Sequence, residues 1–156
     1  MKVKVTEGKT NEKPLVSIYG DYQNVKLSPD QANCLVTYAR TMGYLVSKKL
    51  YANWLIENKY SAQALCRLGF DCIHVPLEEK NSVDHKLIED CKSNVLNNPA
   101  IKIVILVSGD GDFVSLVRQL QTKGKEVIIF AQPQVSQKLI RLANEFYLIS
   151  QIPLCN

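Results

Sequence analysis

Residues 101–113 read IKIVILVSGDGDF, an almost unbroken apolar run that stops at a turn with two aspartates, Asp110 and Asp112. A continuous, largely β-branched run of this length is typical of a strand buried on both faces, as in a parallel sheet covered by helices. Acidic residues are rare in strands and usually lie on solvated helix faces. The turn after this run is therefore a candidate site at the end of a buried strand.

The first apolar run of the chain ends in the same way. Residues 15–19 read LVSIY and are followed by Gly20 and Asp21. Strand and helix patterns alternate from there to the end of the chain. The expected strands are 15–19, 44–52, 70–75, 101–107, 126–131 and 146–149, and the expected helices are 28–42, 57–68, 82–96, about 113–123, and 135–143.

This alternation predicts an α/β fold, a three-layer α/β/α domain with a mostly parallel central sheet and right-handed crossovers. In such a sheet the carboxyl ends of the strands lie on one edge, where ligands bind. A strand order that places the first and fourth strands side by side would bring Asp21 together with Asp110 and Asp112 at this edge.

Length and composition indicate one ordinary domain. The chain has 156 residues, of which 46% are hydrophobic, so it can bury a proper core and is not a disordered or fibrous protein. We expect a single domain over residues 14–150, with polar tails at 1–13 and 151–156. The formal net charge of +4 gives only limited support for a polyanionic partner.

No segment has the pattern of a targeting or membrane sequence. The first thirteen residues are polar and rich in lysine, unlike a signal peptide, and no later apolar run approaches the length of a membrane span. We therefore expect a cytoplasmic protein with no membrane partner. The sequence leaves a homodimer open.

The cysteines show no CxxC spacing, which argues against a zinc site. We expect them to be free thiols, mostly buried, because they fall in apolar helix stripes and in a predicted strand. They are Cys34, Cys66, Cys72, Cys91 and Cys155.

A fourth aspartate, Asp84, begins the helix expected at 82–96. At roughly 100° per residue, the apolar residues of this helix fall within about 60° of Asp84. They are Leu87, Ile88, Cys91 and Val95. We therefore expect Asp84 to open the buried stripe of the helix and to point toward the sheet.

Two further polar residues rank behind the four acids. Asp90 lies about 120° from the buried stripe, so we expect it to flank the site or to face solvent. Asn24 follows Asp21 by three residues and could orient a carboxylate or a water molecule, although asparagine is also an ordinary turn residue.

Gathered carboxylates repel one another unless a cation or a proton neutralises part of their charge. Two carboxylates about 4 Å apart repel by roughly 1 kcal/mol in water and about 4 kcal/mol at an effective dielectric constant near 20. Without a cation some of them would hold a proton. The hard cations Mg²⁺ and Mn²⁺ prefer carboxylate oxygens, and such a site can hydrolyse phosphodiesters. Taken singly, Asp84, Asp110 and Asp112 could equally serve as helix caps or turn residues.

Three aromatic side chains fall near the ends of the first and second strands, where an aromatic ring could stack on an unpaired base. They are Tyr22, Tyr51 and Trp54. Most aromatic residues in such positions pack within the fold, and we expect the same here.

Three segments carry a family resemblance. They are residues 17–25 (SIYGDYQNV), 80–84 (KNSVD, with Leu87 and Asp90 beyond) and 108–113 (SGDGDF). With these segments the chain resembles the NYN domain, a branch of the PIN-like nucleases, in its LabA-like group. The resemblance spans about residues 15–149. Many members have Lys-Gly-Val-Asp where residues 81–84 read NSVD.

The resemblance implies a PIN-like fold, Mg²⁺ or Mn²⁺, and cleavage of single-stranded or structured RNA. Carried over position by position, it implies an acidic metal and catalytic site, with Asn24 in support and Asp90 in a second rank. The four acids of this site are Asp21, Asp84, Asp110 and Asp112. The alternative is a non-catalytic RNA- or protein-binding regulatory module that keeps the nuclease fold.

Overall fold

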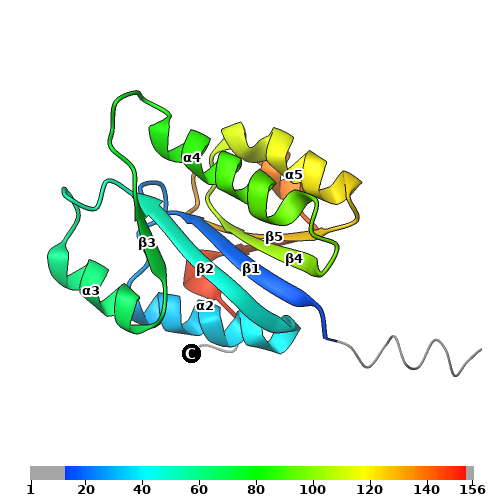
Figure 1. The fold of residues 1–156 in the computed structure, drawn as a ribbon, viewed down its shortest axis with the longest axis horizontal. Helices are drawn as coiled ribbons and strands as arrows, with labels where there is room; N and C mark the ends of the chain where they lie inside the picture. Colours follow the sequence, from blue (N-terminus) through cyan, green and yellow to red (C-terminus); the bar gives the residue numbers. More distant parts are fainter. Residues whose placement is uncertain (1–12, 154–156) are drawn as a thin grey trace, which may run out of the picture.

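A computed structural model describes residues 13–153, which form one six-stranded sheet with helices on both faces (Figure 1). All neighbouring strands are parallel, and their order is β3-β2-β1-β4-β5-β6. The strands are β1 (Leu15–Asp21), β2 (Tyr44–Ala52), β3 (Asp71–His74), β4 (Ile101–Val107), β5 (Glu126–Ala131) and β6 (Glu145–Leu148). The prediction of an α/β domain with a parallel sheet is confirmed.

The helices form the two outer layers. Figure 1 shows α4 and α5 side by side on one face of the sheet and α2 on the other. The helices are α2 (Pro29–Met42), α3 (Lys59–Arg67), α4 (Ser82–Cys91), α5 (Val114–Thr122) and α6 (Gln137–Leu142). A π-helix, Lys92–Leu96, continues α4, and short 3₁₀ helices span Gly111–Phe113 and Ile149–Gln151.

The sheet separates two hydrophobic cores. Successive side chains of a strand point to opposite faces, so Ile105 packs in the core beneath α2, whereas its neighbour Leu106 packs beneath α4 and α5. Both residues are almost fully buried. This two-sided burial explains why the strand sequences are continuously apolar rather than alternating.

Local sequence signals set most helix ends. Ser28 and Gln31 form a reciprocal capping box at the start of α2, with N–O distances of 3.1 and 3.0 Å. Gly69 and Gly124 follow α3 and α5 with φ angles of 89° and 80°, a conformation that favours glycine. Asn58 caps α3 with its side chain, so this helix begins two residues later than expected.

The expectation of free, mostly buried cysteines was wrong for two of them. Cys34 is disulfide-bonded, and the free thiol of Cys66 is exposed because α3 buries only Leu65. Periodicity within one helix reveals neither a partner elsewhere in the chain nor how much of the helix a neighbouring element covers. Cys91 is free and buried, and Cys72 is free and partly buried.

The two predicted tails lie largely outside the described residues. Within residues 13–153, no helix is both long and apolar enough to cross a lipid bilayer.

A buried lysine joins the loops at the amino edge of the sheet. Lys125 is only 6% exposed, and its ammonium group donates hydrogen bonds to the carbonyl oxygens of Asn98 (2.8 Å) and Ile101 (2.7 Å). Burial lowers the pKa of this lysine. The two bonds fix the entry of β4 beside the entry of β5.

We expect Lys125→Ala to lower the free energy of unfolding by about 2 kcal/mol, because two carbonyl groups lose a charged donor. Lys123→Ala, at an exposed position two residues earlier, should change it by less than about 0.5 kcal/mol. Urea denaturation of both variants measures the difference. Equal stabilities would contradict the structural role of Lys125.

Candidate metal centre

The site lies where β1 and β4 end. These two strands are neighbours, and Gly20 is paired in register with Val107. The residues that follow them, Asp21 and the turn 108–112, therefore lie together at the carboxyl edge of the sheet. The strand order that would bring these acids to one edge is the order observed.

Three carboxylates from two segments converge at this edge. Asp84, Asp110 and Asp112 each offer an oxygen atom, and the three oxygens lie within 4.8 Å of one another. Asp84 belongs to the first turn of α4 and is 7% exposed, as its place on the buried stripe predicted. Asp110 is partly exposed and Asp112 is exposed.

The donor set suits a hard divalent cation. Three carboxylate oxygens match the preference of Mg²⁺ and Mn²⁺, and oxygens on opposite sides of one such ion lie roughly 4–5 Å apart. Among residues 13–153, none of the three acids forms an ion pair with a lysine or an arginine. Their negative charge is thus left for a cation to neutralise.

Asp21 lies beside this group and shares a side-chain hydrogen bond with Asp84. Both line a cleft of about 240 Å³ together with Asp110, and Asp21 is 3% exposed. Burial raises the pKa of Asp21. Burial also raises the pKa of Asp84 to about 8, and a hydrogen bond to Asp21 and the charges of Asp21 and Asp110 add to this shift. Without a cation, burial therefore favours a proton on this pair of carboxyl groups.

The turn that carries Asp110 and Asp112 is held by its own polar groups. The Oδ1 atom of Asp110 accepts a hydrogen bond from the amide of Asp112 (2.9 Å), and Ser108 Oγ accepts one from the amide of Asp110 (3.2 Å). Asp110 thus caps the 3₁₀ helix Gly111–Phe113, the ordinary role open to it from the sequence. Because a carboxylate has two oxygens, capping and metal binding are compatible at Asp110.

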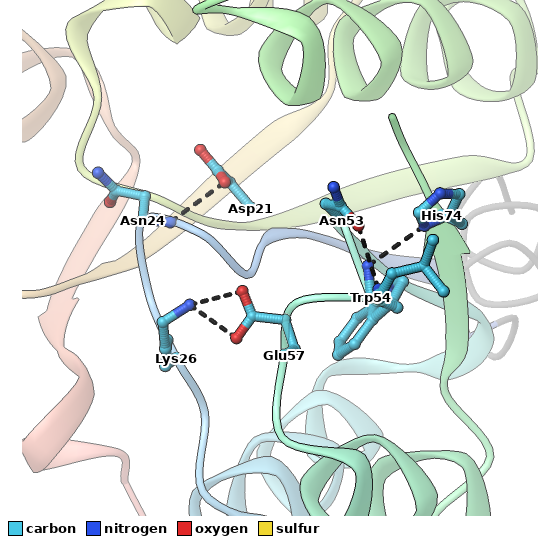
Figure 2. Close-up of polar contacts among 8 residues, drawn as sticks. Asp21, Asn24, Lys26, Asn53, Trp54, Glu57 and His74 are labelled. Carbon is cyan, nitrogen blue, oxygen red and sulfur yellow. Dashed lines mark hydrogen bonds and ion pairs between the residues drawn. The ribbon is translucent and has the colours of Figure 1, made fainter. Parts of the chain in front are cut away.

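Asn24 links the two strand ends. Its side-chain oxygen accepts a hydrogen bond from the amide of Gly109 (2.9 Å), and its own amide donates to Asp21 Oδ1 (3.2 Å). Figure 2 shows the second of these bonds. Asn24 therefore positions Asp21 and the turn before Asp110 relative to each other.

The neighbouring loops of this edge are also tied together. Figure 2 shows Lys26, in the loop after β1, paired with Glu57, in the loop after β2, at 2.9 Å. Beyond it, the amide of Trp54 donates to His74 Nδ1 (3.2 Å) and links the ends of β2 and β3. The cleft therefore borders on loops that are held to one another.

Asp90 lies elsewhere. It is six residues from Asp84 along α4, and its carboxylate accepts a hydrogen bond from the buried hydroxyl of Tyr51 (2.8 Å) and pairs with Lys86 (3.3 Å). Its side chain is 20% exposed, so it neither faces solvent freely nor joins the three-acid group. The angular estimate missed this contact because it could not show that Tyr51 reaches up from β2.

The three aromatic residues pack within the fold, as expected. Tyr51 is fully buried, Tyr22 is 4% exposed, and Trp54 packs on Tyr22 with ring centroids 4.7 Å apart. Two polar residues of the site were missed. Gln23 lines the cleft, and Ser108 orients the Asp110 amide; the position of Ser108 directly after the buried strand was the available signal.

The comparison with known families decides the relationship. The NYN domain pattern matches residues 15–150, which is nearly the whole chain. The chain belongs to the NYN domain family. NYN domains are part of the PIN-like nuclease superfamily, so the resemblance carried by the three acidic segments is confirmed at this level.

One solved structure shares the fold of this NYN domain. A protein of unknown function, VPA0982 from Vibrio parahaemolyticus RIMD 2210633, is 28% identical and superposes with a TM-score of 0.74, over 89% of this chain and 94% of that one. S. aureus homoserine dehydrogenase is 14% identical, with a TM-score of 0.47 over 89% of this chain and 33% of its own. No curated protein matches the NYN domain described here.

We expect Asn24→Ala to weaken Mn²⁺ binding by roughly tenfold to a hundredfold, because the Gly109 amide loses its acceptor and the turn that carries Asp110 is no longer fixed. Asn33→Ala, at an exposed position on α2, is the matched control. Calorimetric titration with Mn²⁺ compares the two. Wild-type affinity in a folded Asn24→Ala protein would contradict the positioning role.

The raised pKa of Asp84 predicts a pH-dependent stability in EDTA. The folded protein binds a proton at Asp84 up to about pH 8, whereas the unfolded chain releases it near the ordinary value of 3.8. Stability therefore falls as pH rises between these values, by up to about 1.4 kcal/mol per pH unit. Asp84→Asn stays neutral, so its melting temperature should exceed that of the wild type near pH 8, and the difference should shrink toward pH 4.

Thermal unfolding in EDTA across this pH range measures the effect. Asp71→Asn, at an exposed residue in β3, should follow the wild-type profile. If the melting temperatures of wild type and Asp84→Asn change in parallel with pH, ionisation of the buried Asp84 carboxyl group does not destabilise the fold.

Proposed function

We propose that this NYN domain is a divalent-metal-dependent ribonuclease that hydrolyses RNA phosphodiester bonds at the carboxyl edge of its sheet. One observation carries the proposal: the carboxylate oxygens of Asp84, Asp110 and Asp112 converge within 4.8 Å. The membership in a PIN-like nuclease superfamily supports it.

Each residue has a distinct part in this proposal. Asp84, Asp110 and Asp112 would hold Mg²⁺ or Mn²⁺, which supplies Lewis acidity toward a phosphate oxygen and activates water. Asp21 lies beside them, within reach of a proton shared with Asp84. Asn24 keeps the two strand ends in place. The open cleft of about 240 Å³ next to these groups gives a phosphate access to them.

The substrate is expected to be single-stranded or structured RNA. An acidic cleft by itself repels phosphate, so binding of RNA at this edge depends on the cation and on basic groups nearby. Three points stay predictions from the sequence: that the metal is Mg²⁺ or Mn²⁺, that the protein is cytoplasmic, and that it can form a homodimer.

Incubation of the full chain with single-stranded and with structured RNA, in Mn²⁺, in Mg²⁺ and in EDTA, tests the function. We expect cleavage only with a divalent cation, and a loss of roughly 10²-fold or more in rate for Asp110→Asn, because one metal ligand is gone. Asp71→Asn, an exposed acid distant from this edge, should cleave at the wild-type rate.

Cleavage that persists in EDTA, or that Asp110→Asn leaves unchanged, would refute the assignment. RNA binding without turnover in any metal would instead support the regulatory module that keeps the nuclease fold.

A further inference from the structure

A basic groove lies between α6 and α5, the helix that follows the acidic turn. A cavity of about 260 Å³ is lined there by Arg118, Lys138, Arg141 and Leu142. All three cationic side chains are exposed. Within residues 13–153, none of them pairs with a carboxylate, since the ion pairs of this part of the chain involve only Lys26 and Lys86. The groove thus presents three uncompensated positive charges.

The segment just before α6 contacts the turn that carries the acids. The amide of Ser136, just before α6, donates a hydrogen bond to the carbonyl of Gly109 (2.9 Å). Gly109 allows this contact because a Cβ atom there would lie 3.1 Å from the Cα atom of Val135. Lys138 follows two residues after Ser136. Arg118 lies six residues beyond Asp112, roughly 10 Å along the helical segment that leads into α5.

The far end of the groove is fixed as well. The side-chain amide of Gln121, in α5, donates to the carbonyl oxygen of Leu142, in α6, at 2.7 Å. The two helices that carry the three basic residues are therefore tied at both ends of the groove. Their charges hold a defined position relative to the site.

The charges on the two sides of the acidic site differ in sign. Residues 114–143, which include α5 and α6, hold one acidic residue and five basic ones, of which Lys125 is buried at the amino edge of the sheet. Apart from the site residue Asp84, residues 78–90, which lead into α4 and form most of it, hold four acidic residues and two basic ones. Glu78, Glu79 and Glu89 line a surface hollow there. A polyanion bound at the site is therefore attracted toward α5 and α6 and repelled from α4.

We propose that the groove between α5 and α6 binds the phosphate backbone of single-stranded RNA where the strand leaves the metal site. The proposal rests on the proposed function, because that site defines where the strand begins. Arg118 and Arg141 offer planar guanidinium groups that can each grip a phosphate with two hydrogen bonds, and Lys138 adds a point charge. The contacts go to the backbone, so the groove sets affinity rather than base preference.

Fluorescence anisotropy with a labelled oligouridine, in EDTA so that no cleavage occurs, tests the groove. The groove variant of the full chain combines Arg118→Gln, Lys138→Gln and Arg141→Gln. The control variant combines Lys59→Gln, Arg67→Gln and Lys102→Gln, which removes the same number of exposed positive charges from α3 and β4. Thermal unfolding checks that both variants are folded.

We expect the groove variant to bind on the order of tenfold more weakly at low salt. Log affinity falls with log salt concentration, and the magnitude of this slope should be smaller by about 2 in the groove variant. The reason is that three phosphate contacts are lost, each of which contributes roughly 0.7 to the slope for a single strand. The control variant should keep both its affinity and its slope. Equal losses in the two variants, or no loss in the groove variant, would overturn the proposal. So would displacement of the RNA by polyglutamate at equal charge concentration.

The two proposals fail in different ways. Groove-dependent binding by a protein that cleaves no RNA would refute the nuclease and support the groove. Metal-dependent cleavage with an unchanged KM in the groove variant would refute the groove and leave the nuclease standing.

Discussion

The carboxylates of Asp21, Asp84, Asp110 and Asp112 repel one another, and the fold must hold them together at the carboxyl edge of the sheet despite this repulsion. Parallel pairing of β1 with β4 sets Asp21 beside the Asp110 turn, and the packing of α4 on the sheet adds Asp84. The hydrophobic cores on both faces hold these elements in place whether or not the charges are neutralised. A rigid scaffold can therefore keep negative groups closer together than they would stand in a flexible chain.

The neighbourhood of the acids limits this strain without adding opposing side-chain charge. Asn24 and Ser108 organise the strand ends through neutral hydrogen bonds, and the proton that burial favours on Asp84 removes one negative charge. No lysine or arginine among the described residues pairs with the acids. Lys80 lines the cleft but forms no ion pair with these acids among the described residues, so their oxygens are left for a metal ion.

The charged residues outside the metal centre are separated by sign on the surface. Acidic residues gather before and along α4, and unpaired basic residues gather along α5 and α6. The modest overall charge of +4 hides this separation. A net charge near zero thus says little about a polyanion partner when opposite charges occupy opposite sides of one site.

Short-range patterns in the sequence predicted the strand and helix order, most boundaries within two residues, and the direction of Asp84. These features depend on neighbours a few positions away, through strand and helix periodicity, capping residues and glycine ends. The disulfide of Cys34, the exposure of Cys66 and the hydrogen bond between Asp90 and Tyr51 were not predicted, because they depend on parts of the chain distant in sequence.

The sequence by itself determined where each strand ends and that an acid follows β1 and β4. Only the tertiary structure decided that these two ends are neighbours, that Asn24 reaches Gly109 across 85 positions, and that Arg118 and Arg141 line one groove. The physical reason is that strand order and helix docking follow from burying two apolar cores at once. No local stretch of sequence contains that information.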